Sequence, residues 1–268
     1  MYNIEVLIAT MHKDNREKII DLLDNMNIKT NSIIVNQCDR NFIDKFEYKT
    51  FKIICIYTTE RGLSKSRNLA LKYATAEIVV IADDDIVYNN DYVDIIQNAY
   101  KNHKNYEILT FMVNDMKKYC SVERKINKYS IHGIISYEIS MKLSSIKDIT
   151  FNEYFGTGSP YFQCGEECIF LSNCIKKKKR IMYIPNKIAY LQQNNRPSTW
   201  FTGYNKEYMI WQGAVYYELS KLLSIPFIML FAIRKFNLYK NDISIFSAIK
   251  YLILGIKEYK KIKKVNRK

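Results

Sequence analysis

Three consecutive carboxylates, Asp83, Asp84 and Asp85, come directly after the apolar run of residues 78–82. This run contains only Ile, Val and Ala, and Ile and Val are typical of strands that are covered on both faces. Adjacent negative charges at the end of such a strand repel one another unless a cation lies among them, and a divalent cation with oxygen ligands is the common solution. The pattern therefore predicts a metal site at the carboxyl end of a buried strand. The alternative is a solvated acidic turn.

The surrounding sequence indicates an α/β arrangement. Apolar runs predict strands over residues 4–9, 32–35 and 51–57. Helices are expected over residues 15–26 and, with Ser64 or Ser66 as the cap, up to residue 74. The order β-α-β-β-α-β predicts a mainly parallel sheet flanked by helices, whose ligands bind outside the carboxyl ends of the strands. Asp39, Arg67 and the three aspartates all fall on that edge, and this convergence favours a binding site over a solvated turn.

Helices and strands continue beyond residue 90. A helix is expected over residues 91–100, and strands over 108–113, 133–139 and 182–185. Residues 155–159 form a loop with two glycines, which could bring backbone close to a ligand. Gly165 precedes an expected helix whose acidic start and basic end match the helix dipole.

The composition is that of an ordered globular chain. Apolar residues make up 48% of the 268 residues, and there are only 8 Gly and 4 Pro. The six cysteines include no Cys-x-x-Cys pair, and the N-terminus has no basic region followed by a long apolar run. We therefore expect a cytoplasmic protein with free thiols and no signal peptide.

The net charge of +14 is concentrated near the C-terminus. Residues 234–268 carry eleven Lys and Arg against two acidic residues, a net +9, which leaves +5 for the first 233 residues. Because the folded domain is less basic, no nucleic-acid partner is expected. Residues 222–233 are apolar but fall short of the roughly 20 needed to span a bilayer, and residues 245–262 have the pattern of an amphipathic helix. This extension is expected either to lie on anionic lipid at the inner face of the plasma membrane or to pack against the catalytic domain.

Four motifs together resemble those of the family 2 glycosyltransferases, which have the GT-A fold. They are Ala9-Thr10 at the end of the first strand, Gly62-Leu63-Ser64-Lys65-Ser66-Arg67-Asn68, the three aspartates, and Gly165-Glu166-Glu167. The resemblance spans about residues 1–200 and depends on the order of all four motifs. It implies a Rossmann-like catalytic domain over residues 1–215, with a nucleotide-binding half (1–115) and an acceptor half (116–215). A basic amphipathic helical extension (216–268) follows.

The resemblance implies a nucleotide-sugar site on the sheet edge. Asp83 and Asp84 would hold the ribose, and Asp85 would bind a Mn²⁺ or Mg²⁺ ion on the diphosphate. Asp83 would be a second metal ligand if the motif is read as Asp-x-Asp. The other residues expected to contact the nucleotide are Ala9, Thr10, Asp39, Lys65 and Arg67.

A general base and an acceptor site are implied in the second half of the chain. Glu167 is the candidate base by position, with Glu166 as the alternative. Gly158 and Trp200 are expected near the acceptor, since a backbone loop and an aromatic face both suit a sugar ring. Many relatives carry a late His near the metal, and the matching residues 190–194 contain none.

These expectations describe a metal-dependent, inverting glycosyltransferase. It would move a sugar from a nucleotide-diphosphate sugar to a saccharide or lipid-linked acceptor during synthesis of a surface polysaccharide such as capsule, LPS or exopolysaccharide. One alternative, a sugar nucleotidyltransferase, would need a glycine-rich loop after the first strand, where residues 9–14 contain no glycine. The other, a non-enzymatic binder of membrane surfaces or nucleic acid, would depend on the basic extension.

Overall fold

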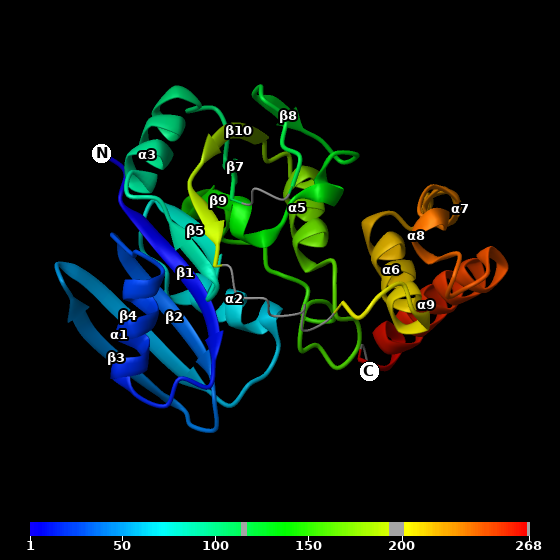
Figure 1. Cartoon of the computed structure of the whole chain (residues 1–268), viewed down its shortest axis with the longest axis horizontal. Coiled ribbons are helices and arrows are strands. Elements are labelled where there is room, and N and C mark those ends of the chain that lie inside the picture. The colour runs from blue at the N-terminus through cyan, green and yellow to red at the C-terminus, as the bar shows by residue number, and fades with distance from the viewer. Residues whose placement is uncertain (114–116, 193–200, 267–268) are drawn as a thin grey trace. The chain divides into compact units, whose positions relative to one another are not determined.

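The computed structural model describes residues 1–113, 117–192 and 201–266 (Figure 1). The chain divides into two compact units: Met1–Phe151 with Phe170–Asn194, and Asn152–Ile169 with Asn195–Lys268. The boundary expected between residues 215 and 216 falls inside helix α6 (Lys206–Leu219) of the second unit. The assignment of nucleotide and acceptor halves stays a prediction.

The first unit is built on a sheet that, among the described residues, has nine strands in the order β3-β4-β2-β1-β5-β9-β7-β10-β8. The strands are β1 (Ile4–Met11), β2 (Asn31–Gln37), β3 (Phe42–Tyr48), β4 (Phe51–Thr58), β5 (Ile78–Asp83), β7 (Ile108–Met112), β8 (Arg124–Ile126), β9 (Ile139–Lys142) and β10 (Ile181–Lys187). Strands β4, β2, β1 and β5 run parallel, whereas β3 and β9 are antiparallel to their neighbours. A short antiparallel pair joins β6 (Ile86–Tyr88) to β11 (Ala189–Leu191). The predicted α/β architecture with a parallel central sheet is confirmed.

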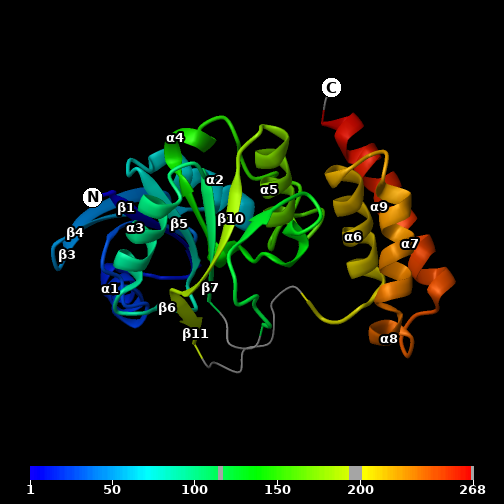
Figure 2. The same cartoon turned by 90° about the horizontal axis from the view of Figure 1, so that it is seen from above.

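Helices cover both faces of this sheet (Figure 2). They are α1 (Arg16–Asn25), α2 (Leu63–Tyr73), α3 (Tyr92–Asn102), α4 (Leu143–Ile146) and α5 (Glu166–Lys176), with single turns of 3₁₀ helix at η1 (Ile131–Gly133) and η2 (Ser136–Glu138). Helices α1 and α3 share one core cluster with alternate residues of β1 and β5, such as Val6 and Val80. Helix α2 lies on the other face. Because successive residues of a strand point to opposite faces, β5 is buried on both sides, as its Ile-Val-Val-Ile sequence predicts.

Two expectations about local structure are wrong, and one strand was not expected. Helix α2 is capped by Gly62, whose φ is 118°, and neither Ser64 nor Ser66 caps it; a positive φ of this size favours glycine. Residues 133–139 do not form one strand, since η1 and η2 occupy most of them and β9 begins only at residue 139. Strand β3 was not expected, because its sequence, Phe-Ile-Asp-Lys-Phe-Glu-Tyr, has neither a continuous apolar run nor a regular alternation, and it lies at a largely exposed edge.

The second unit contains a bundle of helices: α6, α7 (Ser224–Arg234), α8 (Phe236–Tyr239) and α9 (Ile245–Val265). Helix α9 buries Leu252 and Ile256 in a cluster with Met209 of α6 and Ile228 of α7. The apolar side of α9 therefore packs inside the helical unit, and the expected contact of this extension with lipid or with the catalytic domain stays a prediction. Among the described residues, none of the helices has both the length and the hydropathy needed to cross a bilayer.

Helices α6 and α9 approach each other so closely that only glycine fits at two positions. A Cβ atom on Gly213 would lie 1.9 Å from the carbonyl oxygen of Leu252, and one on Gly255 would lie 1.9 Å from that of Ile210. Backbone atoms form both obstacles, so they cannot be relieved by a change of rotamer. The two glycines thus set the separation of the helices.

The variant Gly255→Ala is expected to destabilise the helical unit. The added methyl group forces α6 and α9 apart, and overpacking of this kind costs about 1–3 kcal/mol, which exceeds the helix-propensity gain of about 1 kcal/mol for Ala over Gly. Urea unfolding followed by circular dichroism measures the change. Gly133→Ala is the matched control, since no described atom lies within 4 Å of a Cβ there. Equal stability of the Gly255 variant and the wild type would contradict the close approach of the helices.

Candidate active site

The carboxyl ends of β1 and β5 bring Thr10 and the aspartates together. The two strands pair in parallel with Ala9 opposite Asp83. Thr10 is buried, and its hydroxyl donates a hydrogen bond of 2.6 Å to Oδ2 of Asp84. Two motifs that lie far apart in the sequence therefore meet at one edge of the sheet, where ligands of such sheets bind.

Arg67 reaches the same edge from α2 and is only 2% exposed. Its Nη2 donates to Oδ1 of Asp83 at 3.1 Å and to the hydroxyl of Ser136 at 2.7 Å. The Ser136 hydroxyl in turn donates to Oδ2 of Asp83 at 3.4 Å. A buried guanidinium needs a compensating charge, so the ion pair with Asp83 is part of the architecture of the site. Both carboxylate oxygens of Asp83 are bonded to protein groups.

Ser136 belongs to this cluster although the sequence gave no sign of it. It lies in η2, which is held in place by Glu138, a side chain that is 2% exposed. Glu138 accepts hydrogen bonds from Lys117 Nζ at 2.5 and 2.8 Å, from the Tyr119 hydroxyl at 2.7 Å and from the backbone N–H of Ile135 at 3.2 Å. A single serine between apolar residues is common in any loop, so only the tertiary structure could reveal it.

Two aromatic rings of the first unit pack next to the Arg67 guanidinium. Its guanidinium lies 5.5 Å from the ring centroid of Phe151, and Phe170 of α5 stacks on that ring at 4.2 Å. Asn68 fixes the backbone of Phe151, donating to its carbonyl at 2.9 Å and accepting from its N–H at 2.8 Å. Asn68 thus has a structural role beside Arg67, which explains why the two residues are adjacent in the motif.

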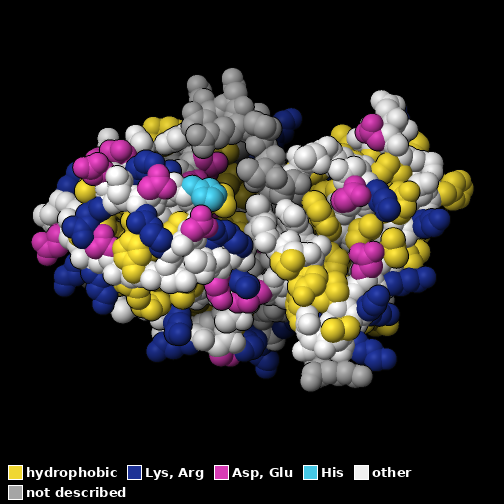
Figure 3. Space-filling view, turned by 90° about the horizontal axis from the view of Figure 1, so that it is seen from below, with side chains coloured by type: hydrophobic (Ala, Val, Ile, Leu, Met, Phe, Trp, Pro, Cys, Tyr) yellow, Lys and Arg dark blue, Asp and Glu magenta, His cyan; other side chains and the backbone are white. Residues whose placement is uncertain are grey.

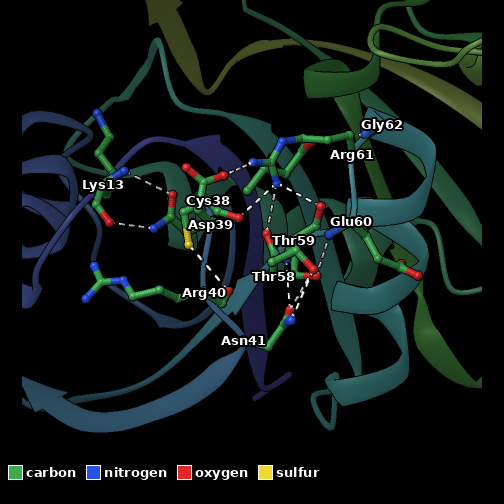
Figure 4. Close-up of polar contacts among 12 residues, drawn as sticks. Lys13, Cys38, Asp39, Arg40, Asn41, Thr58, Thr59, Glu60, Arg61 and Gly62 are labelled. Atoms are coloured by element: carbon green, nitrogen blue, oxygen red, sulfur yellow. Dashed lines mark hydrogen bonds and ion pairs between the residues drawn. The ribbon is translucent and has the colours of Figure 1, made fainter.

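The ends of β2 and β4 form the neighbouring part of the edge (Figure 4). Arg61 points back over them, and its Nη1 donates to the backbone carbonyls of Cys38, Thr58 and Thr59 at 2.9, 3.2 and 2.9 Å. Its Nη2 pairs with Oδ1 of Asp39 at 2.7 Å. The Asp39 side chain is 93% exposed, so this pair is weak. Asp39 lies on the expected edge, held by an arginine that the sequence had not singled out.

Side chains at the end of β2 also fix the adjacent loops. Gln37 Oε1 accepts from the N–H of Gly62 at 3.0 Å and so holds the start of α2. Asn36 bonds both backbone groups of Lys13, at 3.1 and 2.7 Å, and so holds the loop after β1. The expected nucleotide contacts Ala9, Thr10 and Asp39 are therefore bordered by loops that are tied to the sheet by hydrogen bonds.

Asp85 is the exposed member of the three aspartates. Its backbone carbonyl accepts from the N–H of Gln192 at 2.8 Å, next to the pair formed by β6 and β11. No group of three His, Cys, Asp or Glu side chains suited to a metal ion occurs in the part of the chain that the structure describes. Mg²⁺ is commonly bound by one or two carboxylates together with substrate phosphates. Asp85 fits this mode, in which the substrate completes the coordination.

The two candidate base residues begin α5, whose residues 166–169 are assigned to the second unit and whose residues 170–176 are assigned to the first. Glu166 is 5% exposed and Glu167 is half-buried. Gly165 before them has a φ of 82°, and a Cβ there would lie 2.5 Å from Val215 of α6, so the helix start is packed tightly. Glu167 lies one turn before Phe170 along α5.

Two thiols lie near these carboxylates. Burial raises the pKa of Cys164 and Cys168 well above the usual value, and the negative charges of Glu166 and Glu167 raise it further. The thiols therefore stay protonated and uncharged near neutral pH.

The remaining expected site residues are placed as follows. Lys65 is half-buried on α2. Gly158 is exposed in a loop of the second unit, with a φ of 77°. Trp200 lies outside the described residues. The roles expected for these three stay predictions.

The sequence matches the model of glycosyl transferase family 2 over residues 13–153, just over half of the chain. The chain belongs to this family. The match includes Arg67 and the three aspartates, which the structure brings together, and it ends before Glu166. The family assignment therefore rests on a segment that contains Arg67 and the three aspartates and does not include the candidate base residues.

Solved structures with a similar fold come from S. aureus TarS. A structure of TarS residues 1–349 has a TM-score of 0.57 at 12% identity, covering 97% of this family 2 chain and 91% of that one. The complex of TarS 1–349 with UDP-GlcNAc has a TM-score of 0.62 at 14% identity, with coverages of 95% and 81%. At such identities the likeness concerns the fold alone. A comparison with curated protein sequences gives no match.

Proposed function

We propose that this family 2 glycosyltransferase moves a sugar from a nucleotide-diphosphate sugar to a saccharide or lipid-linked acceptor in the synthesis of a surface polysaccharide. The observation that carries the proposal is the cluster on the sheet edge, in which buried Arg67 pairs with Asp83 and Thr10 bonds to Asp84. TarS has been solved with UDP-GlcNAc and with UDP, which makes a uridine nucleotide the first donor to test.

Asp84 and Thr10 are proposed to hold the ribose. The Asp84 carboxylate already accepts a hydrogen bond from one hydroxyl, that of Thr10. A ribose hydroxyl can make the same kind of bond to a carboxylate, which is stronger than a bond between neutral groups. Arg67, which pairs with Asp83, would supply positive charge on the nucleotide side of the site.

Asp85 is proposed to bind a Mn²⁺ or Mg²⁺ ion together with the diphosphate. The described residues provide an exposed carboxylate at this position and no further cluster of ligands, which suits an ion that arrives with its substrate. Asp83 is a weaker candidate ligand, because Arg67 and Ser136 occupy both of its oxygens. Such an ion would stabilise the charge that develops on the leaving diphosphate.

Glu167 is proposed as the base that accepts the proton of the acceptor hydroxyl. A base must reach the substrate, and of the two glutamates that begin α5 Glu167 is the less buried. Attack by the activated hydroxyl on the side opposite to the leaving diphosphate would invert the anomeric carbon. Identification of the product anomer by NMR tests this stereochemistry directly.

A thermal-shift screen of UDP, GDP, CDP and dTDP, each with and without Mn²⁺, tests the donor class. One of them is expected to stabilise the protein by about 5 °C or more at a ligand concentration of 100 times Kd. The shift with the preferred nucleotide should be larger with Mn²⁺. Adenosine and inorganic phosphate serve as controls for the base and the diphosphate. Absence of a shift with every nucleotide, in the presence of metal, would contradict the proposal.

A further inference from the structure

Helix α7 has one apolar face in the core of the helical unit and a second apolar face at the surface. Ile228, Phe231 and Ala232 point inward and are at most 9% exposed. The outward residues of α7, together with Leu222 just before the helix, are here called the α7 surface. They are Leu222, Ile225, Met229, Leu230 and Ile233, with exposed fractions of 89%, 49%, 42%, 46% and 63%. A helix that is apolar on all sides normally has both faces covered, so the α7 surface is suited to a partner.

The charged side chains of the segment that contains α7, residues 219–241, are all positive. Lys221 precedes the helix, Arg234 and Lys235 end it, and Lys240 follows α8; all four are exposed. Residues 219–241 contain no Asp or Glu. Figure 3 shows one face of the helical unit, on which hydrophobic side chains are interspersed with Lys, Arg and a few acidic side chains. The combination of apolar and cationic groups distinguishes this surface from an ordinary protein interface, in which charges of both signs occur.

We propose that the α7 surface binds an anionic lipid bilayer, with the apolar side chains among the acyl chains and the basic side chains at the headgroups. Helix α7 has 11 residues, about 16 Å at 1.5 Å per residue, which suits a helix lying in the plane of the interface. Basic residues beside an apolar face strengthen binding to anionic lipid.

A second copy of the chain fits the same surface less well. In a twofold symmetric dimer the surface would face itself, and four cationic side chains would meet four others with no carboxylate from residues 219–241 between them. Such like-charge contacts oppose association. An anionic bilayer removes this repulsion.

Flotation of the full chain with vesicles tests the proposal without any donor or acceptor, so its outcome is separate from that of the proposed function. Binding is expected to vesicles of phosphatidylcholine and phosphatidylglycerol at 7:3, and to weaken strongly with phosphatidylcholine alone or at 0.5 M NaCl. The variant Arg234→Gln/Lys235→Gln should bind roughly 30-fold more weakly. Ile225→Glu/Ile233→Glu should lose binding.

Matched controls come from the first unit. Val122 is 61% exposed and Lys125 is exposed, so Val122→Glu and Lys125→Gln change the same kinds of side chain elsewhere. Both should bind vesicles as the wild type does, and all variants should keep the wild-type melting temperature. Equal binding by Ile225→Glu/Ile233→Glu and the wild type would overturn the proposal. So would a wild-type dimer that these substitutions convert to monomer while vesicle binding is absent.

Discussion

The variant Glu167→Gln is expected to lower kcat for sugar transfer by about 10²–10⁴-fold, the usual contribution of a positioned general base. Gln has nearly the same shape as Glu but cannot accept the proton of the acceptor hydroxyl. The side chain is half-buried at the first turn of α5, where Gly165 packs closely against Val215. An isosteric change there leaves the packing intact, so nucleotide binding and the melting temperature should be unchanged.

Glu166→Gln is the matched control for this prediction. Glu166 is adjacent in sequence and carries the same group, but it is only 5% exposed, so we expect a smaller loss of kcat. Rates are measured as release of nucleoside diphosphate at saturating donor. Full transfer by a folded Glu167→Gln protein would remove Glu167 from the base role, and a larger loss in Glu166→Gln would assign the role to that residue.

The parts of the fold that follow from local pattern could be predicted from the sequence. The Ile-Val-Val-Ile run of β5 can be stable only between two covered faces, and Asn15 caps α1 through a hydrogen bond from the N–H of Lys18 at 3.0 Å. The return strand expected at residues 182–185 is β10, parallel to β7. In each case a few residues adjacent in the sequence are enough to predict the element.

The parts that depend on distant contacts could not be predicted. Ser136 lies 53 residues from Asp83 along the chain, and it reaches that carboxylate only because buried Glu138 fixes η2. In the sequence Arg61 is not distinguishable from any other basic residue in a loop. Its role becomes clear only from its hydrogen bonds to three backbone carbonyls in the structure. The C-terminal helix α9 has an amphipathic pattern, which favours a membrane surface and a protein core equally. The close contacts at Gly213 and Gly255 show that one side of α9 packs against α6.

The pairing of Arg67 with Asp83 changes how the three aspartates are interpreted. In the sequence alone the three aspartates cannot be distinguished, and the metal ligand can be Asp85 alone or Asp83 together with Asp85. In the structure Asp83 neutralises a buried guanidinium and Asp84 accepts from Thr10. Asp85 is the exposed carboxylate. Because Asp83 and Asp84 already bond to protein groups and Asp85 is exposed, Asp85 is the best placed of the three to bind a cation that enters with the diphosphate.

The variant Asp85→Ala is therefore expected to reduce kcat/KM in the presence of Mn²⁺ by roughly 10³-fold, since a Lewis-acidic ion supplies several kcal/mol of transition-state stabilisation. Its thermal shift with nucleotide alone should persist, whereas the additional shift with Mn²⁺ should disappear. Asp91→Ala is the matched control, because Asp91 is an exposed aspartate that precedes α3 without a capping hydrogen bond from its side chain. A wild-type rate that is insensitive to EDTA, or an Asp85→Ala rate that rises with Mn²⁺ as the wild-type rate does, would exclude this carboxylate as the metal ligand.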